Sequence, residues 1–235
     1  MIASTVVYSG LALAFTGFVC LIGRKRGALA MIAGGLALTI AGLLLPARES
    51  RIARVESRLD EFMPVWQFNE VHSMYIDAPP ARVYEAIRHV RADEIALFRT
   101  LTWIRRCGRD LPPGILNPGE ASLIDVATST TFIFLAADAP RELAVGTIIA
   151  RSQPRELTPQ LFRETLPPGF TLAAMNFIVR PDGAGSLVTT ETRVFANSDR
   201  ARRRFAMYWR AIYPGSALIR RMWLRAVARR AEAPA

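Results

Sequence analysis

The first 46 residues constrain this chain most, because they are mostly apolar and contain no acidic side chain. Two apolar runs cover 2–23 and 27–45, and each is about long enough to cross a hydrocarbon core roughly 30 Å thick. A cationic turn, 24–26, separates them. Since backbone in lipid must satisfy its own hydrogen bonds, we predict that 1–46 is a hairpin of two transmembrane helices.

Small residues recur along both runs at spacings that would let two helices approach closely. They are Gly10, Ala14 and Gly17 in the first run and Ala30, Gly34, Ala37 and Ala41 in the second. A secretory signal peptide is an alternative for the first run, but that run has no charged start and a second run follows directly. A buried helical pair in a soluble protein is disfavoured because neither run has a polar face.

Positive charges flank the second run on both sides. The turn 24–26 precedes it, and four arginines follow it: Arg48, Arg51, Arg54 and Arg58. By the positive-inside rule these two groups favour opposite orientations. We therefore expect a two-pass protein of the inner (plasma) membrane, and the charges alone do not choose the side of the main domain.

The whole chain is basic, with 30 basic and 20 acidic residues and a formal net charge of +10. Such a balance favours anionic partners. Because the basic residues are not interleaved with base-stacking aromatics, we expect a lipid bilayer as partner and no nucleic acid. Two cysteines argue against a disulfide framework, and two histidines argue against a histidine-based metal site. The sequence has no nucleotide-binding glycine loop and no nucleophile elbow, and we expect no cofactor and no metal.

Residues 47–64 are interpreted as an amphipathic linker helix that Pro64 ends. Its apolar stripe consists of Ile52, Val55, Leu59 and Phe62. Such a helix would lie along the membrane or against the domain that follows, 65–235.

The domain 65–235 begins with a strand and two helices, continues with a run of strands and ends with a long helix. Predicted strands are 65–76, 121–128, 131–137, 143–151, 171–180 and 186–196. The last helix, 198–232, carries Trp209 and Trp223 on an apolar stripe, and Pro214 should kink it or break it in two. The loop 152–169 is long enough to be a lid.

This order of elements predicts an α+β domain with helices on one face of an antiparallel sheet. The chain resembles a bacterial branch of the START-like, or SRPBCC, superfamily, which includes polyketide-cyclase-like proteins and lipid carriers. The resemblance is carried by IDAPPARVYEAI, PRELAVG, MNFIVRPDGAGSLVTTETRV and the final helix. It implies a helix-grip fold, in which a curved antiparallel sheet of about six strands surrounds the C-terminal helix and a cavity holds something apolar. Because the superfamily is mostly intracellular, the resemblance favours a cytoplasmic domain.

Several residues are candidates for a ligand site in this cavity. By strand alternation Glu191 and Arg193 share a face, where they either pair with each other on the solvated side or anchor the polar group of a ligand. Further candidates to line the pocket are Asn176, Tyr84, Trp209 and Tyr213. Core packing is the default interpretation of the aromatic residues, and ligand stacking or a membrane-interface contact is the alternative.

Glu70 and His72 alternate onto one face of the first strand and are the candidates for catalysis. Together they could act as acid and base on an enolisable substrate, although a solvated or hydrogen-bonded histidine is the simpler interpretation. The predicted function is membrane-anchored binding, and by extension transfer, of a lipid or another hydrophobic small molecule. The alternatives are a cyclase- or dehydratase-like enzyme that uses Glu70, His72 or Glu191 on an apolar substrate, and a membrane-tethered interaction module.

Overall fold

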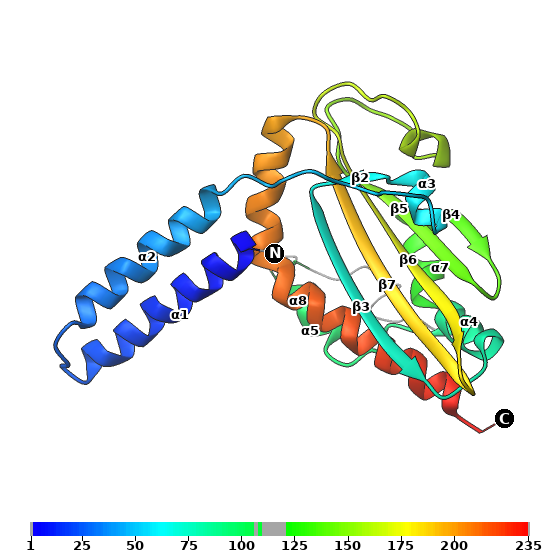
Figure 1. The fold of residues 1–235 in the computed structure, drawn as a ribbon, viewed down its shortest axis with the longest axis horizontal. Coiled ribbons are helices and arrows are strands. Elements are labelled where there is room, and N and C mark those ends of the chain that lie inside the picture. The colour runs from blue at the N-terminus through cyan, green and yellow to red at the C-terminus, as the bar shows by residue number, and fades with distance from the viewer. Residues whose placement is uncertain (1, 106–107, 110–120, 235) are drawn as a thin grey trace. The chain divides into compact units, whose positions relative to one another are not determined.

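The computed structural model describes residues 2–105, 108–109 and 121–234 of the 235-residue chain. The chain forms two compact units, each of which has its own packing (Figure 1). The hairpin unit contains Met1–Arg48 and Arg203–Tyr213, and the sheet unit contains Glu49–Arg202 and Pro214–Ala235.

Two apolar helices make up most of the hairpin unit. They are α1 (Ile2–Ile22) and α2 (Ala28–Leu44). Within α1 the segment Ser4–Ile22 is long and apolar enough to cross a membrane, whereas α2 is a shorter apolar helix of 17 residues. The described residues therefore contain one clear candidate span where the sequence predicts two.

Glycines allow α1 and α2 to pack closely. A Cβ at Gly17 would lie 2.8 Å from the backbone nitrogen of Ile32, and a Cβ at Gly42 would lie 2.8 Å from the Val7 side chain. On α1 the predicted contacts at Gly10, Ala14 and Gly17 are confirmed.

On α2 the predicted contact face is wrong. The buried positions are Ala28, Gly35 and Gly42. The predicted small residues are exposed or only half-buried: Ala30, Gly34, Ala37 and Ala41. Small residues occupy several sides of this helix, so their spacing in the sequence could not select one face.

The core of the sheet unit is a five-stranded antiparallel sheet, which confirms the predicted α+β class (Figure 1). The strand order is β3-β7-β6-β5-β4. The strands are β3 (Phe68–Ile76), β4 (Phe132–Asp138), β5 (Glu142–Ala150), β6 (Thr171–Asp182) and β7 (Gly185–Ala196).

The sixth predicted strand, 121–128, is instead the helix α7 (Leu123–Thr128). Ser122 caps this helix, since its Oγ accepts a hydrogen bond from the Asp125 backbone at 3.0 Å and donates to the Asp125 carboxylate at 2.7 Å. A serine followed three residues later by an acidic residue is a helix-start signal, and here it outweighs the β-branched composition.

The linker 47–64 is only partly helical, which corrects the prediction of one amphipathic helix. A short ribbon pairs β1 (Ser50–Arg51) with β2 (Val65–Trp66), and α3 (Arg58–Phe62) lies between them in the chain. Ser57 and Asp60 form a capping box that starts α3. The apolar residues Leu59 and Phe62 are buried against the sheet.

The two faces of the sheet carry separate cores. On one face, called the helix face here, Phe177 of β6 packs in one cluster with α4 (Pro80–His89) and α8 (Asp199–Glu232). On the other, called the linker face, α3 and the short helix η1 (Pro159–Phe162) pack on β5 and β6. The predicted C-terminal helix is confirmed as α8, and it continues through Pro214 without a break.

Candidate functional site

Polar residues are buried on both faces of the sheet, and the alternation of side chains decides which face each one occupies. Val188 of β7 belongs to the helix-face core, so Thr190 and Thr192 share that face. Glu191 and Arg193 therefore lie on the linker face, opposite Asn176 and Ala174 of β6.

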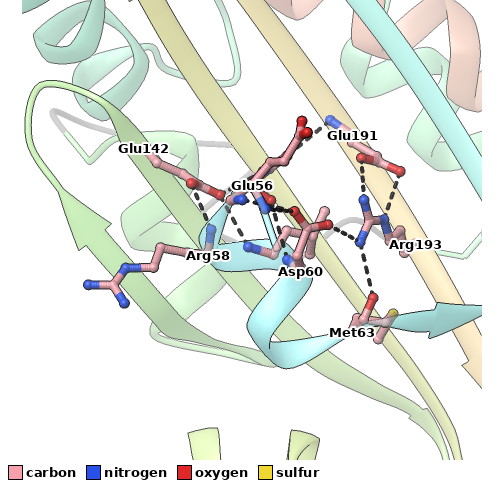
Figure 2. Close-up of polar contacts among 10 residues, drawn as sticks. Glu56, Arg58, Asp60, Met63, Glu142, Glu191 and Arg193 are labelled. Atoms are coloured by element: carbon pink, nitrogen blue, oxygen red, sulfur yellow. Dashed lines mark hydrogen bonds and ion pairs between the residues drawn. The ribbon is translucent and has the colours of Figure 1, made fainter. Parts of the chain in front are cut away.

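The network on the linker face is centred on Arg193 (Figure 2). Its guanidinium donates two hydrogen bonds to Glu191, at 2.7 and 2.9 Å. Its Nη1 also donates to Asp60 at 2.7 Å and to the carbonyl oxygen of Met63 at 3.1 Å. The ring of Trp66 lies 4.1 Å from the guanidinium carbon. Arg193 is thereby held by two carboxylates and an aromatic face while it is only 6% exposed.

Glu142 joins β5 to the start of α3 in the same network (Figure 2). Its carboxylate accepts hydrogen bonds from Asn176 at 2.7 Å and from the backbone N–H groups of Arg58 and Leu59, at 2.9 and 3.2 Å. The first N–H groups of a helix have no partner within the helix, and a carboxylate there also meets the positive end of the helix dipole. Glu142 therefore fastens α3 to the sheet.

The charges of this network stabilise one another. Burial raises the pKa of Asp60, but hydrogen bonds from the Glu56 backbone and Arg193 outweigh it and hold this pKa below its ordinary value. Burial likewise lowers the pKa of Arg193, and its bonds to Glu191 and Asp60 reverse the shift and raise it. A surface groove of about 400 Å³ borders the same residues.

The second cluster lies on the helix face. The Glu70 carboxylate is 2.7 Å from Nε2 of His72 and accepts a hydrogen bond from the Ser216 hydroxyl at 2.8 Å. Glu70 is 4% exposed, so a buried carboxylate connects the edge strand β3 to α8. In the sheet register, His72 is opposite Thr190.

Two buried polar atoms on this face have no hydrogen-bond partner within the described part of the chain. They are Oγ1 of Thr190 and Nε1 of Trp223. Phe177 links them, since it is opposite Thr190 in the register and its ring centroid lies 5.1 Å from that of Trp223. An unsatisfied buried polar group costs about 1–3 kcal/mol, so each one calls for an explanation.

The structure brings some of the sequence-predicted residues together and separates others. Glu70 and His72 are in contact on the helix face, while Glu191, Arg193 and Asn176 form part of the linker-face network. Tyr84 of α4 is buried in the helix-face core, where burial raises the pKa of its hydroxyl.

The remaining two candidates, Trp209 and Tyr213, belong to the hairpin unit, where their ring centroids lie 5.8 Å apart. Among the described residues no group of three His, Cys, Asp or Glu side chains could hold a metal ion.

Sequence reasoning missed several of the residues that organise these two clusters. Asp60 had a local signal, because it stands three residues after Ser57 in a capping pattern. Glu142 had no such signal, because its role depends on Asn176, which is 34 residues away in the chain.

Comparison with known proteins gives distant likenesses in structure only. No family model matches the chain, and no curated protein matches it. Protein MLL2253 from Mesorhizobium loti is 14% identical, with a TM-score of 0.35 over 69% of this chain and 96% of that one. CalU16 from Micromonospora echinospora is 16% identical, with a TM-score of 0.27 over 70% of this chain and 83% of that one.

The di-domain ARO/CYC protein BexL of the BE-7585A biosynthetic pathway is 14% identical, with a TM-score of 0.38. The likeness covers 92% of this chain, which spans 59% of the length of BexL. Likenesses this distant identify neither a family nor a function for the chain.

Proposed function

We propose that this chain is a membrane-anchored protein whose sheet unit binds a hydrophobic small molecule, such as a lipid, on the helix face of a helix-grip domain. The observation that carries the proposal is the pair of orphan polar atoms, Thr190 Oγ1 and Trp223 Nε1, on the face of the sheet that holds the apolar helix-face core. A ligand with an apolar body and one polar group would satisfy both atoms while it buries its own apolar surface.

The chemistry of the two groups limits the kinds of ligand that could bind. The indole Nε1 of Trp223 can only donate, whereas the Thr190 hydroxyl both donates and accepts. The ligand should therefore present an acceptor oxygen, such as a carbonyl, near these two side chains. Aromatic surface from Phe177 and Trp223 suits a flat or unsaturated apolar body.

Membrane anchoring is the second part of the proposal. It is supported by the apolar segment Ser4–Ile22, by the close packing of α1 with α2 and by the absence of acidic residues before Glu49. In this proposal both helices span the inner membrane and the sheet unit is cytoplasmic. Anchoring would keep a poorly soluble ligand close to the bilayer from which it comes.

The test is native mass spectrometry of the full chain after gentle detergent extraction, together with organic extraction of bound material. The wild-type protein should carry a reproducible apolar compound, and Thr190→Val and Trp223→Phe should each lose most of it. Thr189→Val is the matched control, because Thr189 is the adjacent β7 residue on the opposite face. A wild-type protein that is empty in repeated preparations would overturn the proposal.

A second function is favoured by the contact of Glu70 with His72 and Ser216, which places an acid–base pair on the face where the ligand would bind. Glu191, the third residue considered for catalysis, lies on the other face and is paired with Arg193. If the protein is a cyclase- or dehydratase-like enzyme, Glu70→Gln should accumulate a bound compound of different mass from that in the wild type. Identical compounds in both proteins would exclude this second function.

A further inference from the structure

The positive charge of the chain is concentrated in the hairpin unit. That unit holds three cations in the turn, one at Arg48 and three on α8, seven in all, and no Asp or Glu. The sheet unit holds the remaining 23 of the 30 basic residues and all 20 acidic ones. Seven of the ten net positive charges therefore belong to the smaller unit.

The first half of α8 is fastened to the open end of the hairpin. Tyr8 of α1 donates a hydrogen bond to the backbone carbonyl oxygen of Arg210. The Arg210 guanidinium, 3% exposed, donates to the carbonyl oxygens of Leu43 and Leu45, where α2 ends. Carbonyl groups at the C-terminal end of a helix have no partner within the helix, and here Arg210 supplies a donor to them.

The cations thus form two groups at opposite ends of the hairpin. One is the turn 24–26. The other, called the collar here, consists of Arg48, Arg203, Arg204 and Arg210 with the aromatic residues Phe205, Tyr208, Trp209 and Tyr213. The 17 residues of α2 rise about 26 Å, which is close to the roughly 30 Å of a bilayer core. Both groups can therefore reach a headgroup layer at the same time.

The collar has the composition of a membrane interface. Arg203 and Arg204 are exposed, and no carboxylate in the described part of the chain pairs with either of them. Tryptophan and tyrosine favour the same depth, where an apolar ring meets lipid and a polar edge meets water. Here Tyr208 is exposed, whereas Trp209 is buried between Phe205 and Tyr213, with ring centroids 5.9 and 5.8 Å away.

We propose that the exposed arginines of the collar, Arg48, Arg203 and Arg204, bind the headgroups of anionic phospholipids, so that the first half of α8 is part of the membrane anchor. The inference rests on the proposed anchoring of the hairpin and adds the lipid class and the residues that select it. Exposed guanidinium groups bind phosphate oxygens in bidentate fashion, and no acidic neighbour in the hairpin unit competes for them.

The experiment titrates the full chain in detergent with phosphatidylglycerol or phosphatidylcholine and counts bound lipids by native mass spectrometry. The wild type should bind phosphatidylglycerol preferentially. Arg203→Gln/Arg204→Gln should lower the affinity for it roughly 30-fold, since each basic residue near an anionic surface contributes about fivefold. Arg221→Gln/Arg225→Gln removes the same charge from α8 within the sheet unit and should change the affinity less than twofold.

Alkaline carbonate extraction of membranes distinguishes a failure of the anchoring proposal from a failure of the collar proposal. If carbonate releases the wild-type chain, both the anchoring and the collar are overturned. If the chain stays in the membrane but shows no preference for phosphatidylglycerol, or if the control pair loses as much affinity as the collar pair, the collar alone is overturned.

Discussion

Arg193 on β7 and Asp60 on α3 form an ion pair with a nitrogen–oxygen distance of 2.7 Å, and each side chain is 7% exposed. The two residues are 133 positions apart in the chain. Their pairing, with Glu191 on the other edge of the guanidinium, acts together with Glu142 and the buried Leu59 and Phe62 to hold the linker segment on the sheet. A buried charge that loses its partner costs more than the intact pair contributes, so this contact is sensitive to single substitutions.

Arg193→Ala should therefore lower the free energy of unfolding by about 3–5 kcal/mol, because it leaves Asp60 and Glu191 without their cation. Urea unfolding followed by tryptophan fluorescence measures the loss. Arg180→Ala is the control, since Arg180 is exposed on the neighbouring strand β6, and it should cost less than about 0.5 kcal/mol. Equal losses in the two variants would show that the buried network does not hold the linker.

The lowered pKa of Asp60 predicts how stability depends on pH. A carboxyl group whose folded-state pKa lies below its ordinary value of 3.8 stabilises the fold above that value, and the contribution is lost as the pH falls through the folded-state pKa. Asp60→Asn should thus be less stable than the wild type at pH 7 and at pH 5, and the gap should narrow below about pH 4. Unfolding midpoints at pH 7, 5 and 3 test this.

The control for the pH series is Asp182→Asn, at the exposed end of β6, which should follow the wild type throughout. A gap between Asp60→Asn and the wild type that widens as the pH falls would contradict the assigned direction of the shift.

The helix α8 and all five strands of the sheet were predicted from local signals, because the periodicity of apolar residues and the turn residues can be recognised within one segment. The same alternation placed Glu70 with His72, and Glu191 with Arg193. The alternation of side chains could not predict which face of the sheet packs against α8, because both faces of β6 are buried and both carry apolar residues. Because α8 packs on the face that carries Thr190 and Thr192, Glu191 and Arg193 lie on the linker face, where Arg193 contacts α3.

Contacts between distant segments could not be predicted from the sequence, for a physical reason. Glu142 and Asp60 look like ordinary surface carboxylates until the sheet register and the fold of the linker place Asn176 and Arg193 beside them. The two orphan atoms of Thr190 and Trp223 are likewise a property of packing, since only the neighbours in space decide whether a hydroxyl or an indole has a partner.

Thr190→Val gives the helix face a stability test that is independent of ligand identity. In protein stripped of bound material, valine should leave the stability unchanged or raise it by about 1 kcal/mol, because it removes a buried hydroxyl that has no partner. In protein with its ligand, the variant should lose the stabilisation that binding gives to the wild type. Thermal unfolding before and after delipidation measures both, and destabilisation of the stripped variant would mean that the hydroxyl has a structural partner.

Gly35→Ala and Gly34→Ala distinguish the observed α2 contact face from the one expected from sequence. A Cβ at Gly35 would contact the backbone nitrogen of Ala14, whereas one at Gly34 would meet only the Leu13 side chain, at 4.0 Å. Gly35→Ala should therefore destabilise the hairpin by about 1–3 kcal/mol through overpacking. Gly34→Ala should be neutral or stabilising, because alanine is favoured over glycine in a helix by about 1 kcal/mol.

The measurement is the loss of helical circular dichroism of the full chain as sodium dodecyl sulfate is added to a mild detergent. Both variants add one methyl group to the same helix, so their difference reports the contact face and not the change in composition. A larger loss in Gly34→Ala than in Gly35→Ala would mean that α2 presents to α1 the face that contains Ala30, Gly34, Ala37 and Ala41.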